Sequence, residues 1–272
     1  KQKRELVSII KAGPLAAGYE TACWSSLLVQ HLIHQRFGIL YNRHYVCQLL
    51  HNLRISFQKA RFVSDHLDPE KRKRWRKQTW PEILKLAKQH KAMILFEDEA
   101  SFAQWGSLGY TWAPVGEQPE VKTTGIRKGY KIFGAIEYFS GVFYYQGIRD
   151  RFNSESYVLF LRHLINKTSK HIILIHDGAK YHKSKETRKF LEAHKGRLTI
   201  YLLPSYSPDY NPIEFLWKKM KARATHNKYF PDFEDLVGSV DTAMTYFACH
   251  SEEIRCLMGL YVDTLGEESD AA

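Results

Sequence analysis

Two short amphipathic helices are predicted between residues 24 and 53, where apolar positions recur with helical spacing. Their apolar stripes comprise Leu27, Leu28, Val29, Leu32 and Ile33, and then Tyr45, Val46, Leu49, Leu50 and Leu53. Gly38 interrupts the pattern between them, as expected of a turn. This arrangement is typical of a helix-turn-helix, although an ordinary helical hairpin has the same pattern. In a DNA-binding unit, the exposed side of the second helix would present Asn42, Arg43, His44 and Gln48.

Residues 61–91 are predicted to form a basic helical connector. Asp68 followed by Pro69 is a favourable helix start, and Pro81 should kink or restart the helix before the apolar stretch at 83–87. The cationic side chains of this segment are Lys71, Arg72, Lys73, Arg74, Arg76 and Lys77. A charged run is often only a solvated helix face, but this density also suits DNA phosphates. Our candidates for phosphate contact are Arg72, Arg74 and Arg76.

From residue 92 the pattern changes to short apolar strands that alternate with amphipathic helices. The apolar run 93–96 resembles a buried strand and stops at Glu97, Asp98 and Glu99. Further strands are expected over 130–136, 142–148, 171–177 and 198–203, and helices over 153–166, 184–194 and 212–225. This order predicts a mixed α/β sheet with flanking helices over residues 92–272, preceded by a small helical domain in residues 1–60.

The chain is strongly basic, with 40 Lys and Arg against 29 Asp and Glu and a formal net charge of +11. Such an excess favours double-stranded DNA as the partner, because phosphates attract cationic surfaces whatever the base sequence. The four cysteines are too few and scattered for a disulfide framework, and no apolar run is long enough to span a bilayer. We therefore expect a cytoplasmic protein without a membrane partner. Because the sequence starts at Lys1 rather than Met, we also expect residues upstream of it.

Three carboxylates stand out by their positions. Asp98 and Asp177 each follow an apolar strand, and Glu214 lies in the first turn of a helix expected to begin with Asn211 as cap and Pro212 behind it. If the two strands are neighbours, these acids meet at one rim of the sheet and repel one another unless divalent cations neutralise them. Oxygen ligands of this kind suit Mg²⁺ or Mn²⁺, and two such ions would serve phosphodiester chemistry.

Two other interpretations of these residues are weaker. A single acid at a strand end is usually solvated and idle, but three in this order on a basic chain favour a metal site. A zinc site would draw on His176, His182, His194, Cys249 and His250. No spacing among those residues matches a structural or hydrolytic zinc site.

Three sequence blocks carry a resemblance to a known family. They are Glu97-Asp98-Glu99-Ala100-Ser101, the block from His176-Asp177-Gly178 to His182, and the block from Leu203 through Asn211-Pro212-Ile213-Glu214 to Lys221. They resemble the catalytic blocks of mariner-like DDE transposases, above all the bacterial insertion-sequence branch, and the third block is the most distinctive. The resemblance covers residues 92–225 well. Residues 24–60 resemble, less specifically, the second helix-turn-helix or winged unit that precedes the catalytic domain in this family.

The resemblance implies a ribonuclease H-like catalytic domain in which Asp98, Asp177 and Glu214 are the catalytic, metal-binding triad. It implies two Mg²⁺ or Mn²⁺ ions per active site. Between Asp177 and Glu214 lie 36 residues, close to the short spacing of the family. Gly178 stands where the family often has Asn, which removes an amide near the metal but no ligand.

The segment after the first block is rich in tryptophan and glycine and resembles a hairpin of the same family. Trp105, with Tyr110 and Trp112, would stack on an unpaired base near the cut, although such aromatic residues more often belong to a hairpin core. A second basic stretch follows, and its candidates for DNA contact are Lys122, Arg127 and Lys128.

We therefore expect a bacterial transposase that cuts the ends of an insertion sequence and joins the freed 3′-hydroxyls to target DNA. The resemblance implies insertion at TA, a homodimer that holds paired ends, and association with the nucleoid when the protein is bound to DNA. A ribonuclease H-like endonuclease that cuts without joining would use the same triad. A domesticated DNA-binding regulator would need a lost acid, and all three acids are present.

Overall fold

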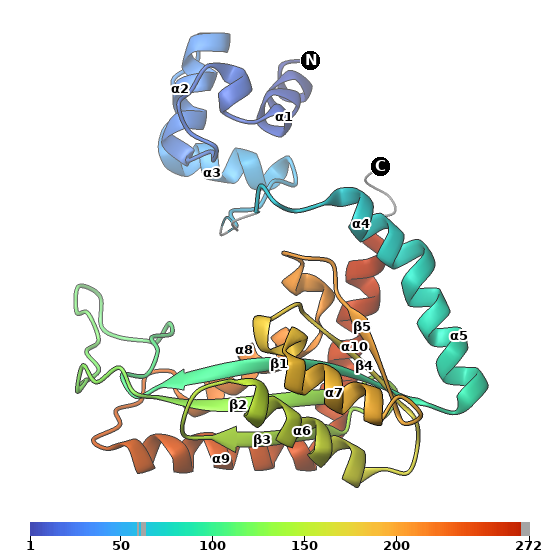
Figure 1. Cartoon of the computed structure of the whole chain (residues 1–272). Helices are drawn as coiled ribbons and strands as arrows, with labels where there is room; N and C mark the ends of the chain where they lie inside the picture. Colours follow the sequence, from blue (N-terminus) through green and yellow to red (C-terminus); the bar gives the residue numbers. More distant parts are fainter. Residues whose placement is uncertain (59, 61–63, 268–272) are drawn as a thin grey trace. The chain divides into compact units, whose positions relative to one another are not determined.

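The chain folds into two compact units, Lys1–Val63 and Ser64–Ala272. The structure, a computed structural model, describes residues 1–58, 60 and 64–267 (Figure 1). Each unit has its own hydrophobic core. Residues 61–63 of the expected connector lie outside the described residues, and the remainder of it belongs to the second unit.

The first unit consists of helices joined by short turns. Its elements are α1 (Gln2–Ala12), the 3-10 turn η1 (Leu15–Ala17), α2 (Ser26–Phe37) and α3 (Arg43–Asn52). Gly38 ends α2 with a left-handed φ of 71°, a conformation that favours glycine, so the predicted turn is confirmed. Helix α1 was not predicted. It completes a core formed by Leu6, Val29, Leu32, Ile33, Val46 and Leu49.

The second unit begins with one long helical rod. It comprises α4 (Pro69–Arg74), the π-helical turn η2 (Trp75–Thr79) and α5 (Trp80–His90). Asp68 caps the rod by accepting a hydrogen bond of 3.0 Å from the backbone N–H of Lys71, as its sequence predicted. Pro81 lies in the first turn of α5, directly after the π turn. The wider turn accommodates the proline, so the helical rod continues through the position where a kink or a restart was expected.

A five-stranded mixed sheet forms the centre of the second unit, in the order β3-β2-β1-β4-β5. The strands are β1 (Met93–Ala103), β2 (Gly129–Glu137), β3 (Phe143–Ile148), β4 (Ile172–His176) and β5 (Leu198–Leu202). Strands β1 to β3 form antiparallel pairs, whereas β4 is parallel to both β1 and β5. The predicted mixed sheet is therefore confirmed. Strand β1 is longer than expected because its pairing with β2 continues to Ala103, so Asp98 lies within the strand rather than at its end.

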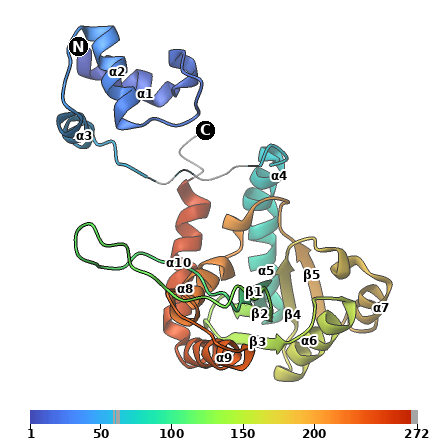
Figure 2. The ribbon, with the colours of Figure 1, turned by 90° about the vertical axis from the view of Figure 1, so that its left-hand side faces the viewer.

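Helices cover both faces of this sheet (Figure 2). Helices α6 (Ser154–Lys167) and α7 (Lys185–Ala193) pack on one face. The other face is covered by α5, α8 (Ile213–Ala224), α9 (Phe233–Cys249) and α10 (Ser251–Glu267). Short 3-10 turns, η3 (Lys180–Lys183) and η4 (Pro208–Tyr210), lie in the loops after β4 and β5. We call the two faces the α6 face and the α8 face.

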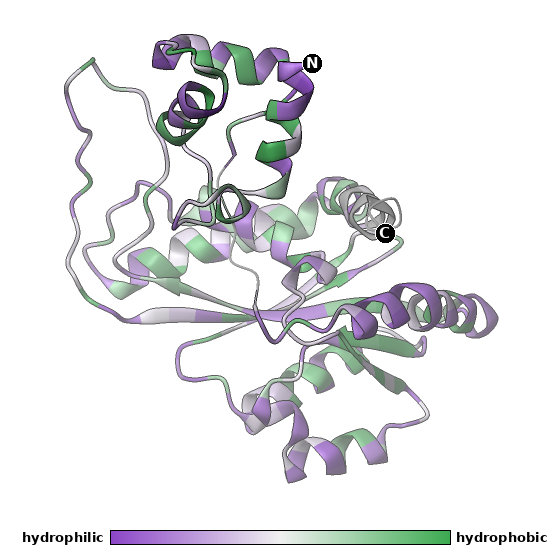
Figure 3. Cartoon of the chain, turned by 90° about the horizontal axis from the view of Figure 1, so that it is seen from above, coloured by the Kyte–Doolittle hydropathy of each residue, from purple (hydrophilic) through white to green (hydrophobic). Residues whose placement is uncertain are grey.

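Alternate residues of the central strands belong to different cores, as the pleat of a strand requires. Leu95 and Leu174 pack on the α6 face, whereas Phe96 and Ile175 pack on the α8 face. Figure 3 shows that hydrophobic and hydrophilic residues alternate along the helices, and that the long strand in front carries hydrophilic as well as hydrophobic residues. None of the described helices is long and apolar enough to cross a membrane. The four cysteines are free and exposed.

Candidate active site

Asp98 and Asp177 are brought together by the parallel pairing of β1 with β4. Phe96 and Ile175 are the last paired residues, and each acid stands two positions further along the chain. Because two positions preserve the side of a strand, Asp98 lies on the same side of β1 as Phe96, the α8 face. Asp177 lies just beyond the end of β4. The prediction that their strands are neighbours is confirmed, although only Asp177 follows a strand end.

Glu214 approaches from the first turn of α8, as predicted. Asn211 does not cap this helix, since Pro212 occupies the N-cap position. Instead the side-chain Nδ2 of Asn211 donates a hydrogen bond of 3.0 Å to the backbone oxygen of Glu97. This bond ties the loop before α8 to β1 and thereby fixes where the helix that carries Glu214 begins.

The same loop is held to the helical rod by Arg72. Its guanidinium donates two hydrogen bonds to the Asp209 carboxylate, at 3.0 and 2.6 Å, and lies 4.1 Å from the centre of the Tyr210 ring. Arg72 is only 6% exposed. Our prediction that Arg72 contacts DNA phosphates is therefore wrong, because its charge is already neutralised inside the protein.

The three acids line one open cavity of about 470 Å³. Its other walls come from the loops after β4 and β5, with Gly178, Ala179, Leu203, Pro204, Ser205, Tyr206, Ser207, Pro208 and Asn211. The Asp177 side chain is 61% exposed, whereas Asp98 and Glu214 are partly buried. The cavity is thus accessible to a large substrate and carries carboxylates on its walls.

These carboxylates lie in surroundings that disfavour negative charge. Burial, together with the charges of Glu214 and Glu99, raises the pKa of Asp98 to about 8. Burial also raises the pKa of Glu214, although Lys218 and Lys221 act in the opposite direction. A cation bound among the three carboxylates would relieve this repulsion, and an all-oxygen donor set fits Mg²⁺ or Mn²⁺.

A second group of polar side chains lies behind the acids, on the α6 face. It contains Glu97, Glu99, His176 and His182, of which Glu99 alone is not buried. His182 Nε2 lies 3.0 Å from Glu99 Oε1, and His182 Nδ1 lies 3.2 Å from the backbone oxygen of Asp177. Burial and the adjacent His182 lower the pKa of His176 to about 3, so its ring is neutral at neutral pH. We did not predict this group. The alternation of side chains along β1 could have indicated it, because it places Glu97 and Glu99 on the side of the strand opposite to Asp98.

The residues proposed to read DNA on the first unit are all exposed. Arg43, His44 and Gln48 lie on the surface of α3. Asn42 is also exposed, but its Oδ1 accepts a hydrogen bond of 2.7 Å from the backbone N–H of Tyr45, so it caps the helix. A DNA contact by these residues stays a prediction.

The candidates on the second unit differ in their surroundings. Arg74, Lys122, Arg127 and Lys128 are exposed, and Arg76 is partly buried. In the long loop between β1 and β2, Trp105 is 47% exposed, and Tyr110 and Trp112 are fully exposed. These aromatic residues therefore do not form a hairpin core. The guanidinium of Arg127 lies 5.9 Å from the centre of the Trp105 ring, and Lys128 Nζ lies 3.9 Å from that of Phe233. A contact between this loop and DNA is also still a prediction.

Comparison with known proteins identifies the family. Residues 93–237, more than half of the 272-residue chain, match the family model of the DDE superfamily endonucleases. The chain belongs to the DDE endonuclease superfamily. Residues 20–79 of this DDE endonuclease match a second model, that of a winged helix-turn-helix. The described part of the first unit contains helices and no strand.

Two similar proteins come from mobile elements. An uncharacterized 39 kDa protein of insertion element IS630 from Shigella sonnei is 28% identical over 235 residues, which is 82% of this chain and 64% of that protein. The transposase of the transposable element Tc1 from Caenorhabditis elegans is 28% identical over 56% of this chain and 60% of its own length. The chain thus spans less than two thirds of either relative. Both relatives agree with the resemblance carried by the three sequence blocks.

Solved structures confirm the fold of this DDE endonuclease. A pre-cleavage Mos1 transpososome has a TM-score of 0.66 at 16% identity, covering 97% of this chain and 78% of the other. A Mos1 strand transfer complex has a TM-score of 0.64 at 18% identity, with 97% and 77% covered. The predicted ribonuclease H-like sheet with flanking helices is therefore confirmed.

Proposed function

We propose that this DDE endonuclease is a transposase that cuts the ends of a bacterial insertion sequence and joins them to target DNA. The convergence of Asp98, Asp177 and Glu214 on one open cavity carries the proposal. Its relatives from IS630 and Tc1 support it. The net charge of +11 supports DNA as the substrate. Such a protein would work in the bacterial cytoplasm, where its DNA lies.

The three acids would hold two Mg²⁺ or Mn²⁺ ions. When bound, the ions would supply the positive charge that activates an attacking oxygen and stabilises a leaving one. The residues around the cavity would keep the acids in place. Trp217 Nε1 donates a hydrogen bond of 3.1 Å to Asp98 Oδ2, and the backbone N–H of Ala179 donates one of 3.0 Å to Asp177 Oδ1. Asn211 fixes the start of the helix that carries Glu214.

Two in-line displacements at phosphorus would follow one another in this cavity. In the first, water attacks the phosphodiester at a transposon end and the bond to the 3′ oxygen breaks, which leaves a 3′-hydroxyl. In the second, that hydroxyl attacks a target phosphodiester and displaces another 3′ oxygen. Each step forms one P–O bond and breaks one, so neither requires a covalent link between protein and DNA.

The rest of the molecule would position the DNA. We propose that the first unit reads the element ends through Arg43, His44 and Gln48, and that Arg74, Arg76 and the exposed loop between β1 and β2 contact the backbone. The exposed Trp105 is suited to stacking on an unpaired base. Insertion at TA and a homodimer that holds paired ends rest on the family resemblance.

A strand-transfer assay tests this function directly. The protein is incubated with Mg²⁺, DNA that carries an element end, and a target plasmid, and the products are sequenced. Joined ends are expected, whereas cut ends that are never joined would favour the nuclease alternative. Asp98→Asn, Asp177→Asn and Glu214→Gln should each abolish cutting and joining but preserve DNA binding. Glu192→Gln, which changes an exposed acid on α7, is the matched control.

A further inference from the structure

Glu97 is a buried carboxylate without a hydrogen-bond partner. It is 0% exposed, and among the described residues neither of its oxygens receives a hydrogen bond. An acid in this position is costly, because burial removes the water that would solvate its oxygens and nothing replaces it. Glu97 belongs to the α6 face and therefore points away from the cavity that Asp98 lines.

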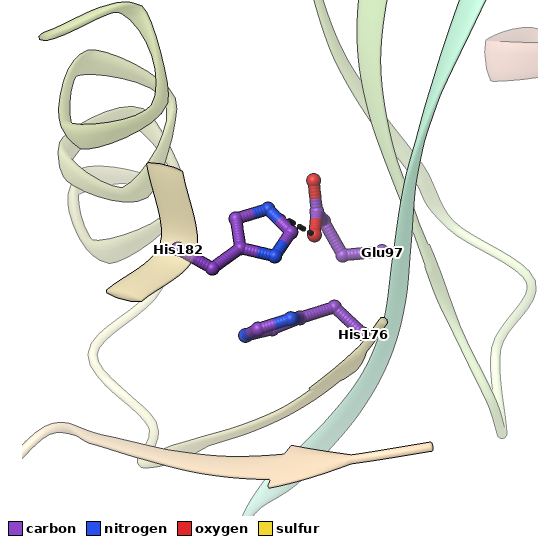
Figure 4. Close-up of side chains that lie close together, drawn as sticks. All are labelled: Glu97, His176 and His182. Atoms are coloured by element: carbon purple, nitrogen blue, oxygen red, sulfur yellow. Dashed lines mark ion pairs between the residues drawn. The ribbon is translucent and has the colours of Figure 1, made fainter. Parts of the chain in front are cut away.

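Two buried imidazoles surround this carboxylate (Figure 4). His182 Nε2 lies 4.0 Å from Glu97 Oε2, and the ring centres of His176 and His182 are 4.2 Å apart. His176 and His182 are 2% and 5% exposed. One ligand atom from each of Glu97, His176 and His182 lies within 4.8 Å of the other two. The figure shows the carboxylate directed at the His182 ring, with the His176 ring beside both.

We propose that Glu97, His176 and His182 form a structural binding site for a divalent transition-metal ion, with Zn²⁺ as its preferred occupant. Two imidazole nitrogens and one carboxylate oxygen are a donor set that suits Zn²⁺, whereas Mg²⁺ prefers oxygen alone. The ion would satisfy the carboxylate, whose oxygens otherwise receive no hydrogen bond. Glu99 Oε1, 3.0 Å from the same His182 nitrogen, offers a fourth donor.

The second nitrogen of each histidine is already oriented, as is usual for metal ligands. His176 Nδ1 and His182 Nδ1 both contact the backbone oxygen of Asp177. In a neutral ring, donation from Nδ1 to that oxygen leaves Nε2 as an electron-pair donor. His182 Nε2 lies 3.0 Å from Glu99 Oε1, so at this nitrogen a bound ion would replace the proton that otherwise joins the two atoms.

This site would link three segments directly behind the catalytic acids. Glu97 lies on β1 next to Asp98, His176 lies on β4 next to Asp177, and His182 lies on η3. A bound ion would fix the spacing of β1 and β4 where their pairing ends. The inference does not depend on transposition, since none of Glu97, His176 and His182 belongs to the proposed triad. The site adjoins the triad, because His182 Nδ1 lies 3.6 Å from Asp177 Oδ1.

Metal analysis of the full chain tests the site. The protein is stripped with a chelator, incubated with Zn²⁺ in the presence of excess Mg²⁺, dialysed and analysed for metal. About one Zn²⁺ per chain is expected, together with a rise in melting temperature. The double variant Asp98→Asn, Glu214→Gln should retain this ion. Glu97→Gln and His176→Gln should each weaken Zn²⁺ binding at least tenfold. Binding lost in the triad variant but kept in Glu97→Gln would overturn the proposal, as would the absence of tightly bound Zn²⁺ in the unsubstituted protein.

Cobalt provides a measurement that does not require any variant to fold. Co²⁺ added to the stripped protein with Mg²⁺ in excess should give the intense visible spectrum of a four- or five-coordinate site with nitrogen ligands. Zn²⁺ should then abolish that spectrum by displacement. A weak spectrum typical of six oxygen ligands would contradict the proposal.

Discussion

The indole of Trp217 donates a hydrogen bond of 3.1 Å from Nε1 to Oδ2 of Asp98. Trp217 lies on α8, one turn beyond Glu214, so the helix that supplies one acid also orients another. We expect Trp217→Phe to keep most of the packing but to lower the rate of DNA cleavage by about tenfold, because a hydrogen bond to a charged group is lost. Cleavage rates of purified protein at saturating Mg²⁺ measure this effect.

Trp80→Phe is the control for that substitution. Trp80 is equally part of the core on the α8 face but contacts Phe96, Tyr138 and Tyr261 rather than an acid. Trp80→Phe should lower the free energy of unfolding without lowering the rate of DNA cleavage by the folded protein. Equal rates for the two variants would show that the indole N–H has no role in orienting Asp98.

Gly134 makes room for this tryptophan. It pairs with Asp98 across β1 and β2, and a Cβ atom at this position would lie 2.5 Å from Cη2 of Trp217. Gly134→Ala should therefore displace the indole, lower the free energy of unfolding by about 1–3 kcal/mol and slow cleavage. Gly196→Ala is the control, because a Cβ there meets no atom within 4 Å. Thermal unfolding and the rate of DNA cleavage are measured for both variants. Equal melting temperatures and equal cleavage rates in Gly134→Ala and Gly196→Ala would refute the prediction.

Stability of the metal-free protein should depend on pH through Asp98. Its pKa is raised to about 8, so the folded state holds this proton more tightly than the unfolded state. The free energy of unfolding should then fall as the pH rises from the unfolded pKa of roughly 4 towards 8. His176, with a pKa of about 3, acts in the opposite sense but only below its unfolded pKa of roughly 6.5.

Between pH 6.5 and 8, the pH dependence of stability therefore reports on the acids and not on His176. In that interval Asp98→Asn should make the decline shallower and raise the melting temperature at pH 8. Part of the decline should remain, because burial also raises the pKa of Glu97 well above its usual value. Added Mg²⁺ should stabilise the unsubstituted protein most at the upper end of the interval. A decline of the same slope in Asp98→Asn would show that this carboxyl does not control it.

The ion pair of Arg72 with Asp209 should contribute to stability rather than to DNA affinity. Their side chains are 7% and 25% exposed, and removing one partner of such a pair leaves an uncompensated charge. Arg72→Gln should lower the free energy of unfolding by about 3 kcal/mol, measured by urea denaturation. Arg74→Gln, on the exposed side of the same helix, should leave stability unchanged and weaken DNA binding instead. The reverse pattern would restore our original assignment of Arg72.

Helix α3 should control which DNA is bound. Arg43→Ala, His44→Ala and Gln48→Ala should each erode the preference for element ends over random DNA, because side chains in the major groove distinguish bases. Arg74→Gln should lower affinity for both DNAs equally and reduce the salt dependence of binding. Binding isotherms at several salt concentrations separate the two classes. An unchanged preference in all three α3 variants would mean that this helix only packs or dimerises.

Short sequence patterns predicted those elements that depend mainly on residues close to one another in the chain. The apolar run at 93–96 and the strand expected over 171–177 fall on β1 and β4, and Asp68 caps α4 as its sequence indicated. The sequence could not reveal that Arg72 is neutralised, because its partner Asp209 is 137 residues away and the two meet only in the folded chain. It predicted the three acids because each stands beside a recognisable element. Glu97 was passed over because its neighbour Asp98 was the obvious candidate. His176 and His182 were rejected as zinc ligands on their spacing, because only the fold brings them close to Glu97.

The alternation of side chains along β1 also determines which insertions and deletions this chain can tolerate. Inserting or deleting one residue just before Glu97 would turn Asp98 to the α6 face and bring its neighbours to the cavity, without removing any acid from the protein. A two-residue change would preserve the faces but shift the acids along the strand by one pleat, out of level with Asp177. Substitutions elsewhere in β1 are expected to lower activity partially, whereas insertions or deletions at this point should abolish it.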